Sequence, residues 1–186
     1  ADGVLLPEWH QTNAALRLCG MSLTGIAQAP WLTDYQIKTM RDAAVAGAYS
    51  MADELGLPRP KLVTTIKPEG TGSKLCDVTE GLHKPLGKYI FNWINYPASD
   101  PLVNLLGEAG YRVIDNPTDP TARLICFPVD NTGCSFDMHG KTEINTDSAV
   151  AQLDHYKRWN TLWTDHNSSI TISWDISELD EIVEWL

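Results

Sequence analysis

The chain has 186 residues, of which 43% are hydrophobic and 20% are charged, and its formal net charge is −10. This length suits one ordinary domain, and the composition is that of a globular protein rather than a disordered one. The negative charge argues against a nucleic-acid-binding protein, because phosphate backbones are bound by clustered Lys and Arg. No apolar segment is long enough to cross a bilayer, and the first residues lack a signal-peptide pattern, so we expect a cytoplasmic protein without a membrane partner.

The first strong element is a long helix predicted at residues 34–55. Thr33 and Gln36 have the spacing of a capping box, and Gly56 follows the last turn as a stop signal. The apolar positions of this helix predict a broad buried stripe. They are Tyr35, Ile37, Met40, Val45, Ala48, Met51 and Leu55.

The rest of the chain alternates strands with helices. Strands are predicted at residues 61–67, 88–97, 111–115, 122–129 and 168–174. Further helices are predicted at residues 101–110, 147–163 and 177–186, the last with Ser177 as its cap. Single strands separated by helices favour parallel pairing in an α/β sheet or barrel. We expect strand 88–97 to be covered on both faces and the polar stretch 130–145 to be irregular.

The cysteines and the tryptophans are given structural interpretations. Cys19, Cys76, Cys126 and Cys134 lie far apart and form no C-x-x-C pair, so reduced and mostly buried thiols are expected, without a metal site. Trp159 and Trp163 lie four residues apart on a predicted helix, which favours core packing over a stacking platform for a base.

The sequence "VTTIKPEGTGSKLCDVTEGLH" at residues 63–83 carries the chemistry. A β-branched run ends at Pro68 and is followed by glycines, hydroxyl residues and a segment compatible with a helix. This arrangement offers backbone N–H groups to a phosphate. The alternative is a simple strand-to-helix turn, and the carboxylate of Glu69 counts against a phosphate site because it repels an anion. The segment matches neither a Walker A motif nor a Rossmann fingerprint.

This loop resembles the Pro-Ser/Thr-Gly-Thr loop of ribonucleotide reductase large subunits, in particular the adenosylcobalamin-dependent (class II) enzymes. The resemblance continues in "RLCGMSLTGIAQ" at residues 17–28, in "DPLVNLLGEAGYRV" at residues 100–113 and in "LICFPV" at residues 124–129. It extends to "QLDHYKRWNTLWTDHNSSITISWD" at residues 152–175. Five ordered segments over most of the chain are a more specific signal than one loop.

The resemblance implies a portion of the ten-stranded α/β barrel, with residues 1–186 as a C-terminal segment of its catalytic domain. It implies an enzyme that reduces ribonucleoside di- or triphosphates to 2′-deoxyribonucleotides through a thiyl radical, which adenosylcobalamin generates. In that family the loop holds the substrate's phosphates. By position, this role falls on Pro68, Glu69, Gly70, Thr71, Gly72 and Ser73. The resemblance assigns no catalytic residue and no metal ligand to this chain.

Two departures from the family pattern shape the expectation. Glu69 stands where the family has Ser or Thr, and the N-P-C-G-E finger loop with the radical cysteine does not occur in these residues. We therefore expect a fragment or split subunit that is inactive without the part carrying that cysteine. Its expected partner is a complementary reductase fragment or a second copy. The alternative is a non-catalytic nucleotide-phosphate-binding or assembly module derived from the same barrel.

Overall fold

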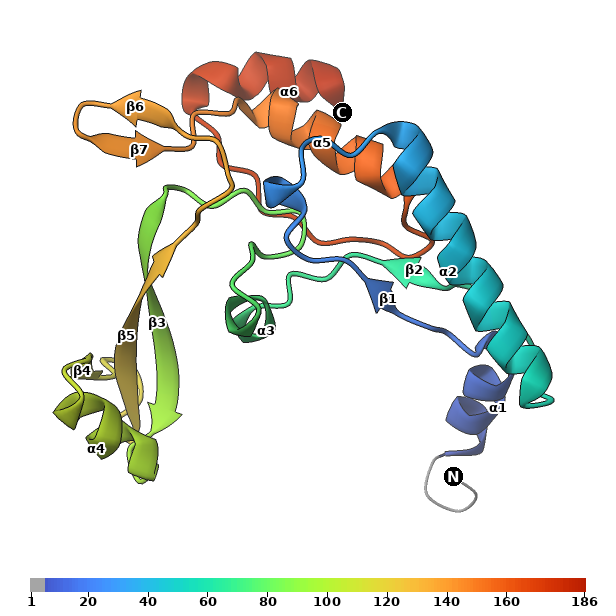
Figure 1. Cartoon of the computed structure of the whole chain (residues 1–186), viewed down its shortest axis with the longest axis horizontal. Coiled ribbons are helices and arrows are strands. Elements are labelled where there is room, and N and C mark those ends of the chain that lie inside the picture. Colours follow the sequence, from blue (N-terminus) through green and yellow to red (C-terminus); the bar gives the residue numbers. More distant parts are fainter. Residues whose placement is uncertain (1–5) are drawn as a thin grey trace. The chain divides into compact units, whose positions relative to one another are not determined.

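The computed structural model describes residues 6–186, except for the side chains of Thr71 and Leu75 (Figure 1). Two compact units make up this part of the chain. The first comprises the described residues up to Lys84 together with Thr146–Leu186, and the second comprises Pro85–Asn145. The candidate phosphate loop belongs to the first unit.

The first unit combines helices with a small parallel sheet. Its elements are α1 (Pro7–Leu16), β1 (Met21–Ser22), η1 (Ile26–Gln28), α2 (Asp34–Glu54), β2 (Thr64–Thr65), α3 (Thr71–Leu75), α5 (Ala149–Leu162), η2 (Ile176–Glu178) and α6 (Leu179–Trp185). Strands β1 and β2 pair in parallel, with Met21 opposite Thr64 and Ser22 opposite Thr65. Parallel pairing around a long crossover helix is thus confirmed here, although the strands are only two residues long.

Helix α2 begins as predicted, because Thr33 and Gln36 form a complete capping box. The prediction of a broad buried stripe on this helix is wrong. Ile37 is buried, whereas Tyr35 is 80% exposed and Met51 is 53% exposed. The helix packs on β2 and α5, and these small neighbours cover only a narrow part of its surface.

The core of the first unit lies where α2, β2 and α5 meet. Trp159 and Trp163 are almost fully buried in it, which confirms their predicted packing role. The indole N–H of Trp163 donates a hydrogen bond of 2.8 Å to the carbonyl of Thr65. Helix α5 is thereby fixed to strand β2. The core cluster consists of Ile26, Ile37, Ala44, Ile66, Leu82, Trp159, Leu162 and Trp163.

The segment after α5 does not form the predicted strand. Residues 168–174 have no regular secondary structure. Their backbone N–H groups find side-chain partners instead of a neighbouring strand: Thr171 N–H donates to His83 Nε2 and Ser173 N–H donates to Gln152 Oε1. The cap of the last helix also differs from the prediction. Asp175, not Ser177, accepts the capping hydrogen bond at the start of η2.

The second unit is built on an antiparallel sheet. Its elements are β3 (Tyr89–Pro97), α4 (Pro101–Glu108), β4 (Arg112–Asp115), β5 (Ala122–Asp130), β6 (Asp137–His139) and β7 (Thr142–Ile144). The strand order is β3-β5-β4, and both β3 and β4 run antiparallel to β5. The expected parallel pairing is therefore wrong for these strands. The reason is the short β4–β5 connection, which lets β5 fold back between β3 and β4.

Two further expectations about the second unit are corrected. Strand β3 alternates between exposed and half-buried residues instead of being covered on both faces, and Phe91 is 73% exposed. Helix α4 packs on β4 and β5, where the Cβ of a residue replacing Gly107 would meet Val113 at 3.7 Å. The polar stretch after β5 is not irregular throughout, because β6 and β7 form a hairpin there. Among the described helices, none is long and apolar enough to span a membrane.

Candidate functional site

The glycine-rich loop leaves the buried strand β2 and leads directly into α3. Residues 63–66 are buried, and the chain emerges at Lys67, whose N–H donates a 2.9 Å hydrogen bond to Ser22 Oγ of the neighbouring strand. Glu69 and Gly70 then have positive φ angles of 64° and 44°. The ψ angle of Gly70 is −118°, so these two residues form a sharp turn rather than the alternating right- and left-handed pair of an anion-binding nest. The predicted strand–turn–helix context of the loop is confirmed.

The donors of this loop are only partly available to a ligand. The N–H of Gly72 donates a 2.8 Å hydrogen bond to the carbonyl of Glu69. The hydroxyl of Ser73 is buried and donates a 2.7 Å hydrogen bond to the carbonyl of Gly70. Both groups therefore stabilise the turn itself. Of the other predicted residues, Pro68 is exposed at the start of the turn, and the side chain of Thr71 lies outside the described residues.

The carboxylate of Glu69 lies close to Gly72 of the same loop instead of pointing away from the loop. Its Oε2 atom is 3.8 Å from the position that a Cβ on Gly72 would occupy. A negative charge thus already stands beside the start of α3, where an anion is electrostatically favoured. Helix α3 has only five residues, so its dipole is small, and the local donors decide the affinity for an anion.

Gly81 lies directly against the backbone at the start of the loop, and it is not among the residues predicted from the sequence. A Cβ at this position would lie 2.4 Å from the carbonyl oxygen of Lys67, and its φ angle is +49°. Only glycine combines this conformation with so close an approach to another backbone. The signal was present in the sequence, because Gly81 belongs to the "TEGLH" segment that follows the loop.

The segment at residues 24–28 holds Gly81 and its neighbours in place. Thr24 Oγ1 donates a 2.8 Å hydrogen bond to the carbonyl of Thr79 and accepts one of 3.3 Å from the N–H of Gly81. Gly25 N–H donates to the same carbonyl at 2.9 Å, and Gln28 Oε1 accepts from Thr79 N–H at 2.9 Å. Residues of the motif "SLTGIAQ" therefore fix Thr79 and Gly81 by hydrogen bonds, and Gly81 in turn lies against the start of the loop.

Asp165 anchors the strand from which the loop emerges. Its Oδ2 atom accepts hydrogen bonds from the N–H groups of Val63 at 3.0 Å and Thr64 at 3.3 Å, and its other oxygen pairs with Arg41. Burial by itself would raise the pKa of Asp165. The hydrogen bonds from Val63, Arg41 and Thr64 outweigh this effect and hold the pKa of Asp165 below its usual value. Asp165 thereby fixes strand β2, which lies far earlier in the chain.

A small hollow adjoins the first residues of the loop. It has a volume of about 330 Å³ and is lined by Cys19, Gly20, Thr65, Ile66, Lys67, Pro68, His166, Asn167 and Ser169. His166 Nε2 lies 2.9 Å from the carbonyl oxygen of Cys19, which closes one side of the hollow. His83 has a structural role, because both of its ring nitrogens are in hydrogen-bonding contact within the unit.

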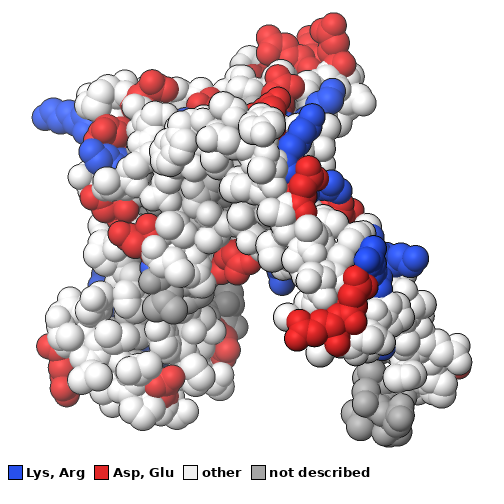
Figure 2. Space-filling view, turned by 45° about the vertical axis from the view of Figure 1, so that its right-hand side comes forward, with Lys and Arg blue, Asp and Glu red and all other residues white. Residues whose placement is uncertain are grey.

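The charges around the loop are balanced rather than strongly positive. Lys74, beside the loop, is 3.4 Å from Glu80. On the face shown in Figure 2, the described Lys and Arg side chains stand in small groups among Asp and Glu side chains. An anion at the loop therefore gains little from long-range attraction, and its binding depends on close contacts.

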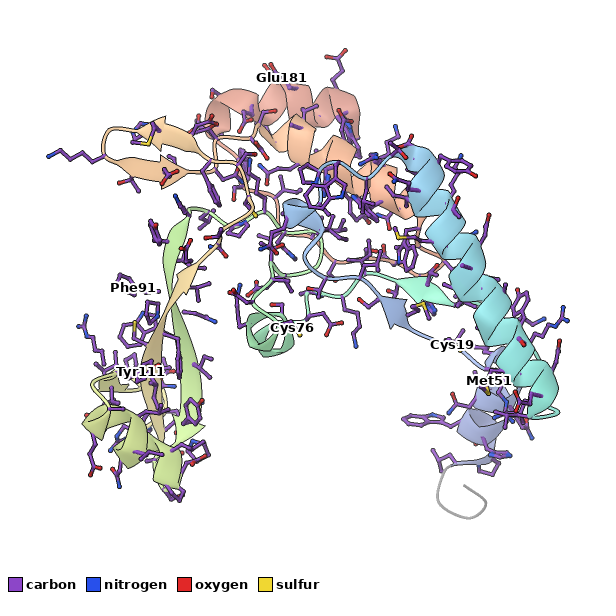
Figure 3. All side chains as sticks on the ribbon, in the orientation of Figure 1. Cys19, Met51, Cys76, Phe91, Tyr111 and Glu181 are labelled. Carbon is purple, nitrogen blue, oxygen red and sulfur yellow. The ribbon has the colours of Figure 1, made fainter. Side chains whose placement is uncertain are left out.

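The cysteines are free thiols, and their burial differs from the prediction. Cys126 is buried and Cys134 is half-buried, but Cys19 and Cys76 are exposed. Figure 3 shows Cys19 on the segment that leads into β1 and Cys76 at the end of α3. Both exposed positions lie outside the regular core elements, where the chain has few neighbours to cover a side chain.

Comparisons with known proteins relate the chain to one enzyme family. No family model matches it. It is 31% identical over 150 residues to the adenosylcobalamin-dependent ribonucleoside-triphosphate reductase of Lactobacillus acidophilus, which is 81% of this chain and 20% of the relative. The enzyme of the same name from Lactobacillus helveticus is 30% identical over 144 residues, covering 77% of this chain and 19% of the relative.

A solved structure supports the same relationship at the level of the fold. The crystal structure of a B-12 dependent (class II) ribonucleotide reductase matches 94% of this chain with a TM-score of 0.74 and 22% sequence identity. The match covers 28% of the reductase chain. The mixed α/β fold described above is therefore that of a portion of this enzyme. The chain spans about a fifth of the length of the curated relatives, and it is partially homologous to the adenosylcobalamin-dependent (class II) ribonucleotide reductases.

Proposed function

We propose that residues 68–73 hold the phosphate groups of a ribonucleotide that a ribonucleotide reductase converts to its 2′-deoxy form. The observation that carries the proposal is the conformation of the loop. It leaves a buried strand, turns sharply through positive φ angles at Glu69 and Gly70, and enters a helix, while Gly81, which residues 24–28 hold in place, lies against the backbone of Lys67. Partial homology to the reductases supports this assignment.

The chain's own part in the reaction is binding and orientation. Gly72 presents a side of the backbone that carries no Cβ, so a phosphate oxygen can approach the start of α3 closely. The buried Ser73 hydroxyl keeps the turn in this shape through its bond to Gly70. Holding the phosphates fixes the position of the ribose, which is where a reductase acts.

Adenosylcobalamin is the cofactor that the relatives' names give. When bound, it supplies a radical. The hollow beside the loop does not fit it, because about 330 Å³ is at the lower end of the range for a drug-sized ligand and cobalamin is far larger. We therefore assign no step of the reaction through the cofactor to these residues. The proposal is that the cofactor and the radical cysteine are supplied by a complementary part of the enzyme.

The test is to compare ADP and ATP with adenosine by isothermal titration calorimetry, using the wild-type chain and Gly72→Val. If the loop binds phosphate, ADP and ATP bind more tightly than adenosine, and Gly72→Val removes this difference in affinity. The variant is expected to fold, since a Cβ at this position has only Glu69 nearby, at 3.8 Å.

Gly47→Val on α2 is the matched control, because nothing lies within 4 Å of a Cβ at that position. Unchanged nucleotide affinity in a folded Gly72→Val chain would show that the loop does not bind phosphate. Equal affinity for adenosine and ATP in the wild-type chain would also show that the loop does not bind phosphate.

A second experiment concerns activity. We propose that this chain alone does not reduce nucleotides with adenosylcobalamin, and that adding the reductase part with the N-P-C-G-E finger loop produces activity. Restored turnover supports an enzyme. Phosphate binding without restored turnover favours the non-catalytic module.

A further inference from the structure

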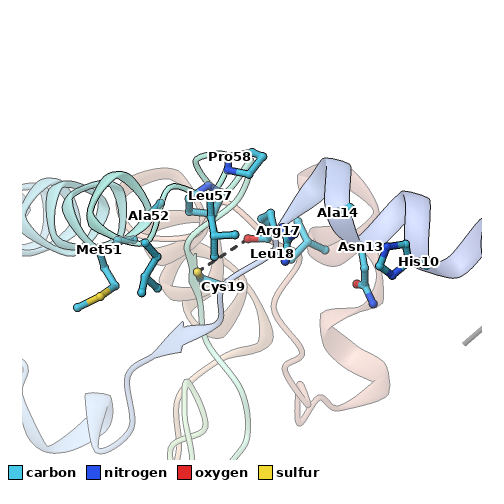
Figure 4. Close-up of a pocket in the computed structure, with 13 residues that line it drawn as sticks. His10, Asn13, Ala14, Arg17, Leu18, Cys19, Met51, Ala52, Leu57 and Pro58 are labelled. Carbon is cyan, nitrogen blue, oxygen red and sulfur yellow. Dashed lines mark hydrogen bonds between the residues drawn. The ribbon is translucent and has the colours of Figure 1, made fainter. Parts of the chain in front are cut away.

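A groove of about 770 Å³ lies in the first unit, away from the phosphate loop (Figure 4). Strands β1 and β2 run in parallel, so their carboxyl ends lie at one edge and their amino ends at the other. The phosphate loop follows β2, whereas the groove is formed by segments that precede the strands: Leu18 and Cys19 before β1, and Pro58 and Pro60 before β2. The groove therefore lies at the opposite end of the strands.

The two walls of the groove differ in chemistry. One wall is α1 with the residue after it, where His10, Asn13 and Arg17 recur at the spacing of one helix face. The other wall is apolar and comes from the end of α2 and the loop that follows. Figure 4 shows Met51 and Ala52 from α2, with Leu57 and Pro58, on this side. A groove of this size suits a small molecule.

Arg17 supplies a positive charge without a counter-ion among the described residues. Arg41, Arg59, Arg123 and Arg158 each pair with an aspartate, and Arg112 lies over the ring of Trp93. These are all the other arginines of the sequence. Arg17 also has a left-handed backbone, with φ 46° and ψ 43°, at the end of α1. Glycine is the usual residue at such a position, so the sequence keeps an arginine there against the backbone preference.

The apolar wall consists of large side chains that are exposed to water when the groove is empty. Met51 is 53% exposed, Leu55 is 61% exposed and Leu57 is 40% exposed. These side chains gather beside a polar wall, which is the arrangement of a ligand site rather than of scattered surface residues. Burying hydrocarbon against them is favourable, and Arg17 favours an anionic head group.

We propose that this groove binds a small organic carboxylate with an apolar body, with the carboxylate at Arg17 and the body against Met51, Leu55 and Leu57. This site is separate from the proposed phosphate loop and goes beyond that function. Asn13 offers a neutral hydrogen-bonding group beside the same head group, because it shares the helix face with Arg17.

Two exposed thiols allow a direct test in one molecule. Cys19 lines the groove, whereas Cys76 is exposed at the end of α3 and does not line it. Octanoate is the probe, and alkylation of each cysteine by iodoacetamide is followed by peptide mass spectrometry. The free fraction of the groove sets the Cys19 rate, so this rate falls about tenfold when octanoate reaches about nine times its Kd. The Cys76 rate stays unchanged.

Chemical and protein controls separate the two parts of the site. Acetate has the charge without the body and 1-octanol has the body without the charge, so both protect Cys19 less than octanoate does. Arg17→Gln loses most of the octanoate protection, and Arg17→Lys keeps part of it. Arg59→Gln is the matched control, because Arg59 is on the neighbouring loop but pairs with Asp53 and does not line the groove.

Several results would overturn the proposal. Equal protection of Cys19 and Cys76 would show non-specific binding, and equal protection by octanoate and 1-octanol would remove the role of charge. Unchanged protection in Arg17→Gln, or a Cys19 thiol that does not react in the ligand-free protein, would also contradict it. None of these measurements uses a nucleotide. Because Cys19 also lines the hollow beside the phosphate loop, the loss of protection in Arg17→Gln assigns the site to the groove, which Arg17 lines and the hollow does not share.

Discussion

Replacing Glu69 by Gln is expected to tighten phosphate binding to the loop by about fivefold to tenfold. The Glu69 carboxylate lies beside Gly72, so a phosphate seated there stands roughly 5 Å from a negative charge. At this distance two unit charges repel by about 0.8 kcal/mol in water and about 3.3 kcal/mol at an effective dielectric constant of 20. Glu69 is exposed, so the lower value applies. A phosphate dianion doubles it to about 1.6 kcal/mol, and salt reduces it to about 1.0–1.4 kcal/mol.

The assay is calorimetric titration with pyrophosphate at low salt and at about 0.5 M salt, where the Debye length is only a few ångströms. Because the effect is electrostatic, the advantage of Glu69→Gln is expected to shrink at high salt. Glu54→Gln, at the exposed end of α2, removes the same charge far from the loop along the chain and is the control. Equal affinity of the wild-type and Glu69→Gln chains, or an advantage that does not depend on salt, would refute the electrostatic reasoning.

The remaining predictions concern the residues that support the loop. Gly81→Ala is expected to destabilise the chain by more than about 2 kcal/mol in urea unfolding, since its Cβ would lie 2.4 Å from Lys67 O. The control is Gly56→Ala, which also has a positive φ angle (+63°) but has open space around the Cβ. This control is expected to cost only about 1 kcal/mol, from backbone strain alone. Equal losses would show that Gly81 is needed for its φ angle alone. Because the folded pKa of Asp165 is lowered, its stabilising effect is present above about pH 4 and is lost as the pH falls further. Asp165→Asn is therefore expected to lower stability at pH 7 and to flatten its decline between about pH 5 and pH 2, and a decline as steep as that of wild type would contradict this role.

Local signals in the sequence predicted several elements well. The capping box at Thr33 and Gln36 and the Asp100-Pro101 start of α4 are encoded in neighbouring residues, and both helices begin where these signals lie. The turn from β2 into α3 was predicted for the same reason, because proline and glycine restrict the backbone within a few residues.

Strand pairing could not be predicted in the same way. The order of strands and helices is compatible with parallel neighbours, and only the folding back of β5 between β3 and β4 makes the sheet antiparallel. The segment 168–174 has the composition of a strand, yet the side chains of His83 and Gln152 take up N–H groups that a neighbouring strand would otherwise bind. Such partners lie far away in the sequence, so no local pattern reveals them.

The candidate site shows the same division between local and distant information. The loop itself was recognised, but the occupation of Gly72 N–H and Ser73 Oγ by neighbouring carbonyls depends on the turn geometry. The need for glycine at position 81 could not be predicted, because it depends on the close approach of Gly81 to the backbone of Lys67. The position of the Glu69 carboxylate depends on a left-handed backbone that glutamate rarely adopts.

The discontinuous first unit has a consequence for the order in which the chain folds. Residues 85–145 are contiguous, and β4 and β5 are joined by a short connection, so this unit has a low contact order and can form as soon as it is synthesised. The first unit has to wait, because Arg41 meets Asp165 across 124 positions and Thr64 meets it across 101. Until α5 is made, Ile37 and Ile66 lack the tryptophans that cover them, and their apolar surface is open to aggregation. Synthesis from the amino terminus therefore leaves β2, the strand that leads into the proposed phosphate loop, among the last parts to become ordered.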